Sequence, residues 1–346
     1  MVSSQFGWKK NPFSFRLMSD FFIGYNKEKM EVYQGLNNGD KFALLLGPTG
    51  SGKTTFMMYI QRAFRNYKLL FLPKPPKNPS DWIEIFNPVL GRPFPFFKRN
   101  ISLYNLHERL NKKLGSKRCL VFVDECHEAS VESLEWIRSI ADQTENLSVM
   151  IAGLPVLEKN LKDSLETLLK RVTINVRLTN LTKSETRELI KKRIESHGGT
   201  DIYPFTNEVV DEIYEKTAGF PREILRICDD LVKKAVEKNM TTIDINFMKE
   251  MDTETTARVA IETVDRLPER QKTILKLLSS RGAMTPNEIA DSAGGMQEYK
   301  DKGNAIRAMN NILKRLMDDG FVERDRQGKV YVYKVSGKLK TILVTA

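Results

Sequence analysis

The stretch GPTGSGKTT, Gly47 to Thr55, decides the fold of this 346-residue chain. It contains the pattern G-x-x-x-x-G-K-[ST], in which glycines let consecutive backbone N–H groups converge on a phosphate. A helix that starts directly after the loop adds its positive N-terminal end. We expect Lys53 to reach the β- and γ-phosphates and the Thr54 hydroxyl to bind Mg²⁺. The full candidate loop is Gly47, Pro48, Thr49, Gly50, Ser51, Gly52, Lys53, Thr54 and Thr55.

The surroundings of this loop favour phosphate binding over the alternative, a glycine-rich turn without a ligand. An apolar strand pattern, residues 43–46, precedes the loop, and a helical pattern, residues 54–64, follows it. The motif requires both neighbours. The predicted cofactors are therefore ATP and Mg²⁺.

A second motif, CLVFVDE at residues 119–125, ends an apolar strand in two carboxylates. We expect Asp124 to hold Mg²⁺ through water and Glu125 to act as the general base on the attacking water. The alternative is a pair of acidic residues that merely caps the strand. His127 and Glu128 are interpreted as surface residues at the start of the next helix, with a role in tuning Glu125 as the lesser alternative.

Five short apolar runs indicate an α/β fold. They are continuous rather than alternating, which is typical of parallel strands covered on both faces. Amphipathic helical patterns, such as residues 131–141, lie between them, so we expect a parallel sheet between helical layers. The runs are residues 42–46, 69–72, 120–123, 149–152 and 172–178.

Strand patterns stop after residue 178. A capping box, Thr182 with Glu185, opens one helix, a second is expected over residues 207–217, and a third starts at Pro221. We therefore predict four regions: a nucleotide-binding base at residues 1–178, a helical lid at 179–252, a connector at 253–267 and a further domain at 268–346.

The last region has the order helix, short helix, long helix and β-hairpin, which is the order of a winged helix-turn-helix. It carries 15 Lys and Arg against nine Asp and Glu, which gives +6 of the chain's net charge of +11. A basic surplus favours polyanionic partners.

Double-stranded DNA is the predicted partner of this region. The polar face of the long helix, residues 303–318, and the hairpin tip present side chains suited to bases and phosphates. The alternatives are a solvated basic face and a protein-docking module. The candidate DNA contacts are Asn304, Arg307, Asn311, Lys314, Arg315, Arg324, Arg326 and Lys329.

The remaining composition excludes several classes of protein. No apolar run approaches the ~18–20 residues of a membrane span, and the start lacks a signal-peptide pattern. The three cysteines, Cys119, Cys126 and Cys228, have no metal-site or disulfide spacing. We expect no membrane partner and a cytoplasmic protein, associated with the nucleoid if the source is prokaryotic. The proline-rich segment 73–97 is expected to be a long ordered loop or insertion. Its aromatic part, Trp82 to Phe97 with Lys98 and Arg99, is expected to pack against the N-terminal segment, with contact to DNA or a partner subunit as the alternative.

Taken together, these motifs resemble the AAA+ ATPases. The closer similarity is to the branch with origin-recognition-type initiators, ExeA-like ATPases and transposition ATPases such as TnsC. It rests also on FGWKKNPFSF at residues 6–15, LTNLTKSETRELIKKRI and GFPREILRICD, and covers residues 6–250. The resemblance implies that the N-terminal stretch lies near the adenine and that the protein forms a homo-oligomer or pairs with another AAA+ subunit.

The resemblance also implies roles for single residues. Arg222 matches the sensor-2 arginine, which contacts the phosphates, with a plain surface arginine as the alternative. Arg171 stands where an arginine finger completes a neighbour's site, with Lys170 and Arg177 as competitors. Sensor 1 departs from the pattern, because Gly153 follows the strand where a polar residue is expected. Either Ser148 substitutes poorly or the role is absent, so we expect slow ATP hydrolysis.

Three functions remain open at this point. The first is an ATP-dependent assembly switch on duplex DNA, in replication initiation, transposition or plasmid maintenance. The second is an ATP-gated winged-helix transcriptional regulator. The third, ranked lower, is a secretion-associated ATPase like ExeA.

Overall fold

The computed structural model describes residues 5–91, 101–252, 267–292, 302–328 and 330–336. The chain divides into two compact units, residues 1–245 and 246–346, and each is treated by itself. The candidate DNA contact Lys329, the connector residues 253–266 and the aromatic residues Phe94, Phe96 and Phe97 lie outside the described residues.

A five-stranded parallel sheet forms the centre of the first unit, with the strand order β2-β3-β4-β1-β5. The three central strands are buried along their whole length, as their continuous apolar runs predicted. The edge strand β5 instead alternates between buried and exposed residues, because only one of its faces is covered. The strands are β1 (Phe42–Leu46), β2 (Lys68–Leu72), β3 (Cys119–Val123), β4 (Leu147–Gly153) and β5 (Val172–Arg177).

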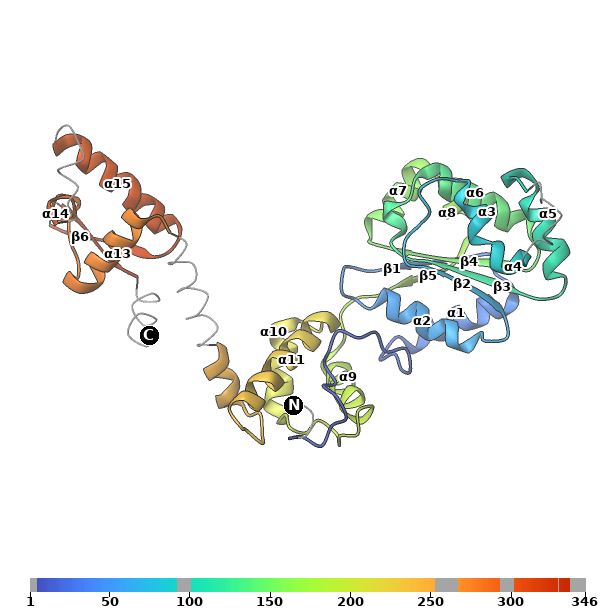
Figure 1. Ribbon diagram of the computed structural model, residues 1–346, viewed down its shortest axis with the longest axis horizontal. Helices are drawn as coiled ribbons and strands as arrows, with labels where there is room; N and C mark the ends of the chain where they lie inside the picture. The colour runs from blue at the N-terminus through green and yellow to red at the C-terminus, as the bar shows by residue number, and fades with distance from the viewer. Residues whose placement is uncertain (1–4, 92–100, 253–266, 293–301, 329, 337–346) are drawn as a thin grey trace. The chain divides into compact units, whose positions relative to one another are not determined.

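Helices cover both faces of this sheet, which confirms the predicted α/β layers (Figure 1). On one face, Ala43 and Leu45 of β1 pack with Phe56 and Met57 of α2. On the other face, Phe42, Leu44 and Leu46 join a second core. The first face carries α1 (Asn26–Asn38) and α2 (Lys53–Ala63), and the second carries α5 (Leu103–Leu114), α6 (Val131–Gln143), α7 (Val156–Ser164) and α8 (Glu166–Leu169).

The aromatic segment after β2 belongs to the second of these cores. It forms two short helices, α3 (Asp81–Ile85) and α4 (Asn87–Leu90), whose Trp82 and Phe86 are fully buried. The indole of Trp82 donates a hydrogen bond of 3.0 Å to the carbonyl of Ser133 on α6. The expectation that these aromatic residues pack against the N-terminal segment was therefore wrong for Trp82 and Phe86, because α5 and α6 offer a closer apolar surface.

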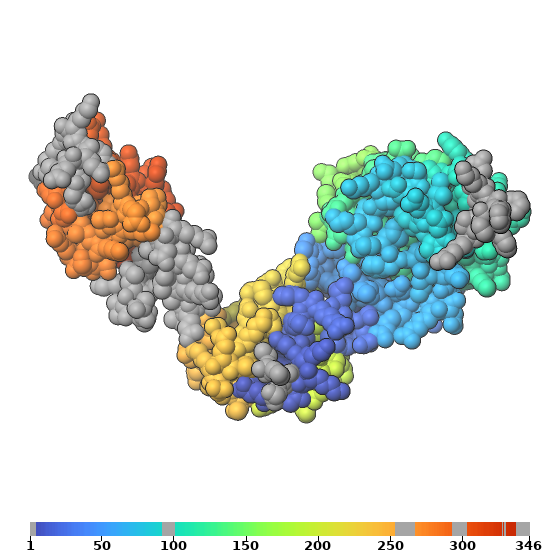
Figure 2. Space-filling view, viewed as in Figure 1, coloured from blue at the N-terminus to red at the C-terminus, as the bar shows by residue number. Residues whose placement is uncertain are grey.

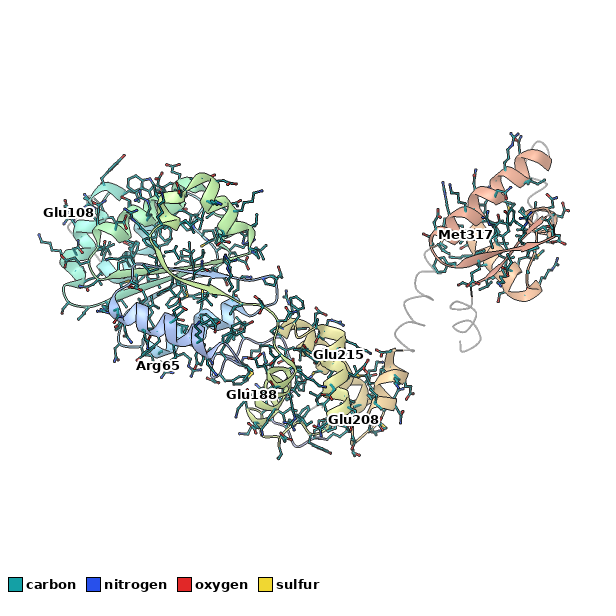
Figure 3. All side chains as sticks on the ribbon, turned by 180° about the vertical axis from the view of Figure 1, so that it is seen from behind. Arg65, Glu108, Glu188, Glu208, Glu215 and Met317 are labelled. Carbon is teal, nitrogen blue, oxygen red and sulfur yellow. The ribbon has the colours of Figure 1, made fainter. Side chains whose placement is uncertain are left out.

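Three helices follow the sheet within the first unit, and we call residues 179–245 the lid. The helices are α9 (Lys183–Glu195), α10 (Asn207–Thr217) and α11 (Pro221–Glu237). The predicted capping box at Thr182 and Glu185 is present, and α11 starts at Pro221 as expected. Figure 3 shows Glu188, Glu208 and Glu215 projecting from α9 and α10, so the outer surface of the lid is charged.

The N-terminal segment packs on the lid rather than on the sheet, as Figure 2 shows for its dark blue atoms. Arg193 of α9, only 7% exposed, donates to the carbonyls of Pro12, Ser14 and Arg16 at 3.2–3.4 Å. Burial lowers the pKa of Arg193 to about 10, because the charged guanidinium group loses contact with water. The three hydrogen bonds offset part of this desolvation cost. Phe13 stacks edge-on against Phe205. Residues 5–16 thus belong structurally with the lid, although the predicted base spanned residues 1–178.

Within the lid, the segment that leads into α9 makes a close backbone contact with the turn before α11. The N–H of Leu181 donates to the carbonyl of Gly219 at 2.8 Å. Gly219 has φ +77°, and a Cβ added there would lie 2.0 Å from the carbonyl oxygen of Leu181. Only glycine fits this position, because both its φ and its space exclude a side chain.

We expect Gly219→Ala to destabilise the first unit by about 3 kcal/mol or more, since backbone must move to make room. Gly39→Ala is the matched control: its φ is +90°, and nothing lies within 4 Å of the added Cβ. The control should lose only the conformational cost of about 1–2 kcal/mol. Denaturant unfolding followed by tryptophan fluorescence measures both, because Trp8, Trp82 and Trp136 all lie in the first unit. An equal loss of unfolding free energy in the two variants would refute the close contact between Gly219 and Leu181.

The second unit confirms the predicted order of helices and hairpin. Its helices are α13 (Glu269–Arg281), α14 (Pro286–Ser292) and α15 (Lys302–Asp318), and its antiparallel strands are β6 (Val322–Gln327) and β7 (Val330–Val335). Met284 forms an additional antiparallel bridge with Tyr333. Apolar side chains from all three helices and the hairpin build one small core, including Leu275, Ile289 and Leu313. This is the architecture of a winged helix-turn-helix.

Candidate functional site

The loop between β1 and α2 has the conformation that phosphate binding requires. Gly50 and Gly52 have φ of +82° and +97°, which side-chain-bearing residues rarely adopt. The helix α2 begins at Lys53, directly after the loop, so its free N–H groups and positive end face the loop. The predicted residues Gly47 to Thr55 therefore come together as one turn at the carboxyl end of β1.

Lys53 is buried inside this turn with 6% of its surface exposed. Its Nζ donates to the carbonyl oxygens of Gly47 at 2.9 Å and Pro48 at 3.1 Å. Burial lowers the pKa of Lys53, and the carboxylates of Glu125 and Asp124 partly oppose this shift. A buried ammonium held only by two carbonyls is strongly attracted to an added polyphosphate.

Thr54 and Asp124 form the candidate Mg²⁺ site. The Thr54 hydroxyl donates to Oδ2 of Asp124 at 2.5 Å, and Asp124 is 3% exposed. Asp124 follows β3 at the same end of the parallel sheet as the loop, and its Oδ1 accepts from the N–H of Glu125 at 2.8 Å. Mg²⁺ prefers one or two protein oxygens together with waters and substrate phosphates. This pair of oxygens fits that requirement.

Glu125 is held at the edge of the same site by an unusual backbone. Its φ is +53°, and it caps the short 3₁₀ turn η1 (Cys126–Glu128). Its Oε2 lies 3.4 Å from Nδ1 of His127, whose side chain is 17% exposed. The interpretation of His127 as a surface residue was wrong, because η1 turns the imidazole back toward Glu125. Glu128 does lie on the surface and pairs with Lys74 at 2.9 Å.

The lid reaches the loop through Arg222, the second residue of α11. A Cβ built on Gly50 would lie 2.9 Å from Cβ and 3.3 Å from Cδ of Arg222. Its side chain is exposed and forms no ion pair within the described part of the chain. The structure therefore places an unpaired guanidinium group beside the candidate phosphate site, while its contact with phosphate remains a prediction.

Arg171 lies at the opposite end of the sheet. It precedes β5, whose start pairs with Phe42 at the start of β1, so about 16 Å of strand separates it from its own loop. Its Nε pairs with Oδ2 of Asp142 at 2.5 Å. The competitors are paired as well, Lys170 with Glu166 and Arg177 with Glu158. Because Arg171 is remote from its own loop, a finger role would require a neighbouring subunit, and this role stays a prediction.

The strand β4 ends at Gly153, beside the loop. Gly47 donates its N–H to the carbonyl of Gly153 at 3.2 Å. Ser148 is buried at the other end of β4, five residues and about 16 Å away. It is therefore too far from the loop to take the sensor-1 role.

Sequence reasoning missed Phe22. A Cβ on Gly52 would lie 3.4 Å from the Phe22 ring, which packs against Phe56 at 5.2 Å between ring centroids and against Tyr59 at 6.3 Å. This aromatic cluster supports the loop from outside. Neither a motif nor a periodic pattern marks Phe22, because it lies in an irregular segment whose packing partner comes from α2.

The candidate DNA contacts on α15 share one exposed face. Asn304, Arg307, Asn311, Lys314 and Arg315 are all exposed, while Met309, Leu313 and Leu316 are buried. On the hairpin, the guanidinium carbon of Arg324 lies 4.3 Å from the Tyr331 ring centroid, and Arg326 is exposed. Lys334 neutralises the acidic residue Asp325 at 2.6 Å. The structure brings the helix residues together, and DNA contact remains a prediction.

Comparisons with known proteins agree with this geometry. A family model described as AAA domain matches residues 36–161, which contain the loop and both carboxylates. The structure is similar to the Aeropyrum pernix ORC2 protein, solved as ADPNP-ADP complexes, with a TM-score of 0.56, 13% identity and 98% of each chain covered. It is also similar to the A. pernix ORC1 protein solved with DNA, with a TM-score of 0.51, 17% identity and coverage of 96% and 95%. Residues 36–161 therefore match an AAA domain, and the chain has the same fold as the ORC and Cdc6 proteins.

Two curated proteins are similar in sequence. An uncharacterized HTH-type transcriptional regulator of Methanocaldococcus jannaschii is 23% identical over 97% of this chain and 92% of its own length. The general secretion pathway protein A of Aeromonas hydrophila is 26% identical over 66% of this chain but only 44% of its own length. Among the described residues, no helix is long and apolar enough to cross a membrane.

Proposed function

We propose that this protein is an ATP-binding and ATP-hydrolysing AAA+ switch that assembles on duplex DNA. The observation that carries the proposal is the convergence of Lys53, the Thr54–Asp124 pair and Arg222 on one glycine-rich loop. Lys53 would supply positive charge to a magnesium-bound triphosphate, and the Thr54–Asp124 pair would ligate the metal. Arg222 would contact the phosphates from the lid.

The chemistry assigned to the site is an in-line attack of water on the γ-phosphate. Mg²⁺, when bound to Thr54 and Asp124, would neutralise developing charge on the phosphates. Glu125 accepts a proton from the attacking water, and Lys53 stabilises charge on the phosphate oxygens. Arg171 of a neighbouring subunit would supply further positive charge, so we propose that turnover depends on assembly and is slow in the monomer.

The DNA-binding part of the proposal rests on the exposed basic face of α15. A helix that carries Arg and Asn on its outer side can enter a major groove, and the hairpin can contact the backbone beside it. ATP binding in the first unit would favour the assembled, DNA-bound state, and hydrolysis would reset it.

A second candidate function is an ATP-gated transcriptional regulator. The observation in its favour is the similarity to the M. jannaschii HTH-type regulator, which spans nearly the whole of both chains. A regulator of this kind would occupy one operator without forming higher assemblies. A secretion-associated role ranks lower, because the chain spans only 44% of the A. hydrophila protein.

The deciding experiment measures mass and ATPase activity together. Light scattering with the purified full chain would follow particle mass with ATP, with ADP, and with each plus duplex DNA. The switch predicts larger particles with ATP and DNA together, and faster phosphate release in that sample. A constant 1:1 complex on one DNA sequence, with unchanged turnover, would favour the regulator instead.

The basic face of α15 makes a quantitative prediction for DNA affinity. Arg307→Ala/Arg315→Ala should weaken binding and reduce the slope of log affinity against log salt by about 2, since each lost phosphate contact contributes about 0.9. Lys276→Ala/Arg281→Ala, on α13, removes the same charge away from this face and is the control. Fluorescence anisotropy across a salt series measures both. An equal change of slope in the two double variants would show that α15 has no special role.

A further inference from the structure

At Gly153, the end of β4 packs closely against η1 beside the phosphate loop. Gly153 offers no side chain there, and none would fit: a Cβ would lie 2.8 Å from Cδ2 of Leu157 and 3.3 Å from the backbone nitrogen of His127. The turn η1 therefore packs directly on the end of β4. Gly153 itself supplies no polar side chain to the site, and η1 is the neighbouring element that can.

His127 is the polar side chain in this place. Its Nδ1 lies 3.4 Å from Oε2 of Glu125, and the ring is largely buried. The same Nδ1 has no hydrogen-bond partner within the described part of the chain. A buried, unpaired polar atom costs free energy unless a partner comes within reach. A small rotation of the Glu125 carboxylate supplies that partner.

Glu125 in turn needs a restraint. Its left-handed backbone is a strained conformation for a residue other than glycine. The Asp124 carboxylate fixes the Glu125 backbone N–H at 2.8 Å, but this bond leaves the Glu125 side chain free to rotate. The other nearby charges are already engaged, since Glu128 pairs with Lys74 and Lys53 bonds to the loop carbonyls. His127 is thus the group placed to orient the carboxylate.

We propose that His127 is a positioning residue for the general base: its Nδ1–H donates to one carboxylate oxygen of Glu125 and leaves the other oxygen to receive the proton of the attacking water. This inference rests on the proposed hydrolysis at the same site. In this role His127 acts through the Glu125 carboxylate, so its loss should slow the chemical step and leave ATP binding intact. A base displaced by about 1 Å can lose roughly 100-fold in rate.

The test compares four variants of the full chain. His127→Leu keeps the approximate size of the ring without a polar atom, and His127→Asn places an amide close to the position of Nδ1. His107→Leu on α5 is the control for loss of a histidine elsewhere in the AAA domain. We expect His127→Leu to lower kcat roughly 100-fold with an unchanged ATP Kd, and His127→Asn to recover most of the rate. The control should match the wild type.

The fourth variant, His127→Leu in a Glu125→Gln background, separates positioning from a merely structural role. Positioning predicts no further loss of kcat, because the group that His127 orients is no longer a base. A further loss equal to that of His127→Leu alone would overturn the inference, as would a kcat like the wild type in both His127 variants. If His127→Leu folds poorly, His127→Gln replaces it, because its longer side chain moves the amide away from the position of Nδ1, and the same loss of kcat is expected. A wild type without any turnover would overturn the proposed hydrolysis and this inference together, whereas the other outcomes concern His127 alone.

Discussion

Lys53→Ala should reduce affinity for ATP at least about 100-fold, because it removes two or more charge-assisted hydrogen bonds of about 1.5–3 kcal/mol each. The ammonium is 6% exposed and bonds only to loop carbonyls, so its position matches a bound phosphate. Isothermal titration calorimetry with ATP and Mg²⁺ measures the change directly.

Lys159→Ala is the matched control for this variant. Lys159 is an exposed lysine on α7 within the same domain, so its removal changes net charge equally without touching the loop. The control should bind ATP like the wild type. ATP affinity within threefold of the wild type in Lys53→Ala would remove the loop from the nucleotide site.

Glu125→Gln should keep ATP affinity and lower turnover by about 10²–10⁴-fold, since the amide cannot accept the proton of the attacking water. The change preserves the size of the side chain and the backbone that η1 imposes. Steady-state phosphate release, together with a binding measurement, separates this loss from a loss of affinity.

Glu128→Gln is the neighbouring control. It removes an acidic group three residues away that forms an exposed ion pair with Lys74, and an exposed ion pair contributes little to stability. Its turnover should equal that of the wild type. If Glu125→Gln hydrolyses ATP as fast as Glu128→Gln, another group is the base.

Much of the fold could be predicted because its signals are local. The five apolar runs, the Thr182 capping box and Pro221 at the start of α11 each follow from a few adjacent residues. The strand β5 was less regular than expected, since burial of both faces depends on which strands end up at the edge of the sheet. Sequence order alone does not give the order β2-β3-β4-β1-β5.

The sequence predicts those parts of the candidate site whose residues all belong to one short motif. Gly47 to Thr55 and the carboxylates after β3 are of this kind, and parallel strands bring the two motifs to the same edge. Contacts that depend on three dimensions were not predictable. Three contacts are of this kind, because no sequence pattern links the segments that form them. They are the packing of Phe22 beside Gly52, the approach of His127 to Glu125 and the burial of Trp82 against α6.

Arg222 illustrates the intermediate case. Its place at the start of α11 follows from the sequence, but its approach to Gly50 depends on how the lid packs against the base, which no sequence pattern gives. The role of Arg171 cannot be derived from a single chain, because its proposed partner is a phosphate bound to another subunit. In the single chain it pairs with Asp142 instead.

The central claim is that nucleotide binding by the first unit and DNA binding by the second influence each other. Calorimetry of ATP binding to Glu125→Gln, with and without saturating duplex DNA, tests this claim most directly, because the variant holds ATP without consuming it. The account predicts at least about fivefold tighter ATP binding in the presence of DNA, and by linkage an equal gain in DNA affinity with ATP. Identical ATP dissociation constants in the two titrations, with DNA shown to be bound, would contradict it.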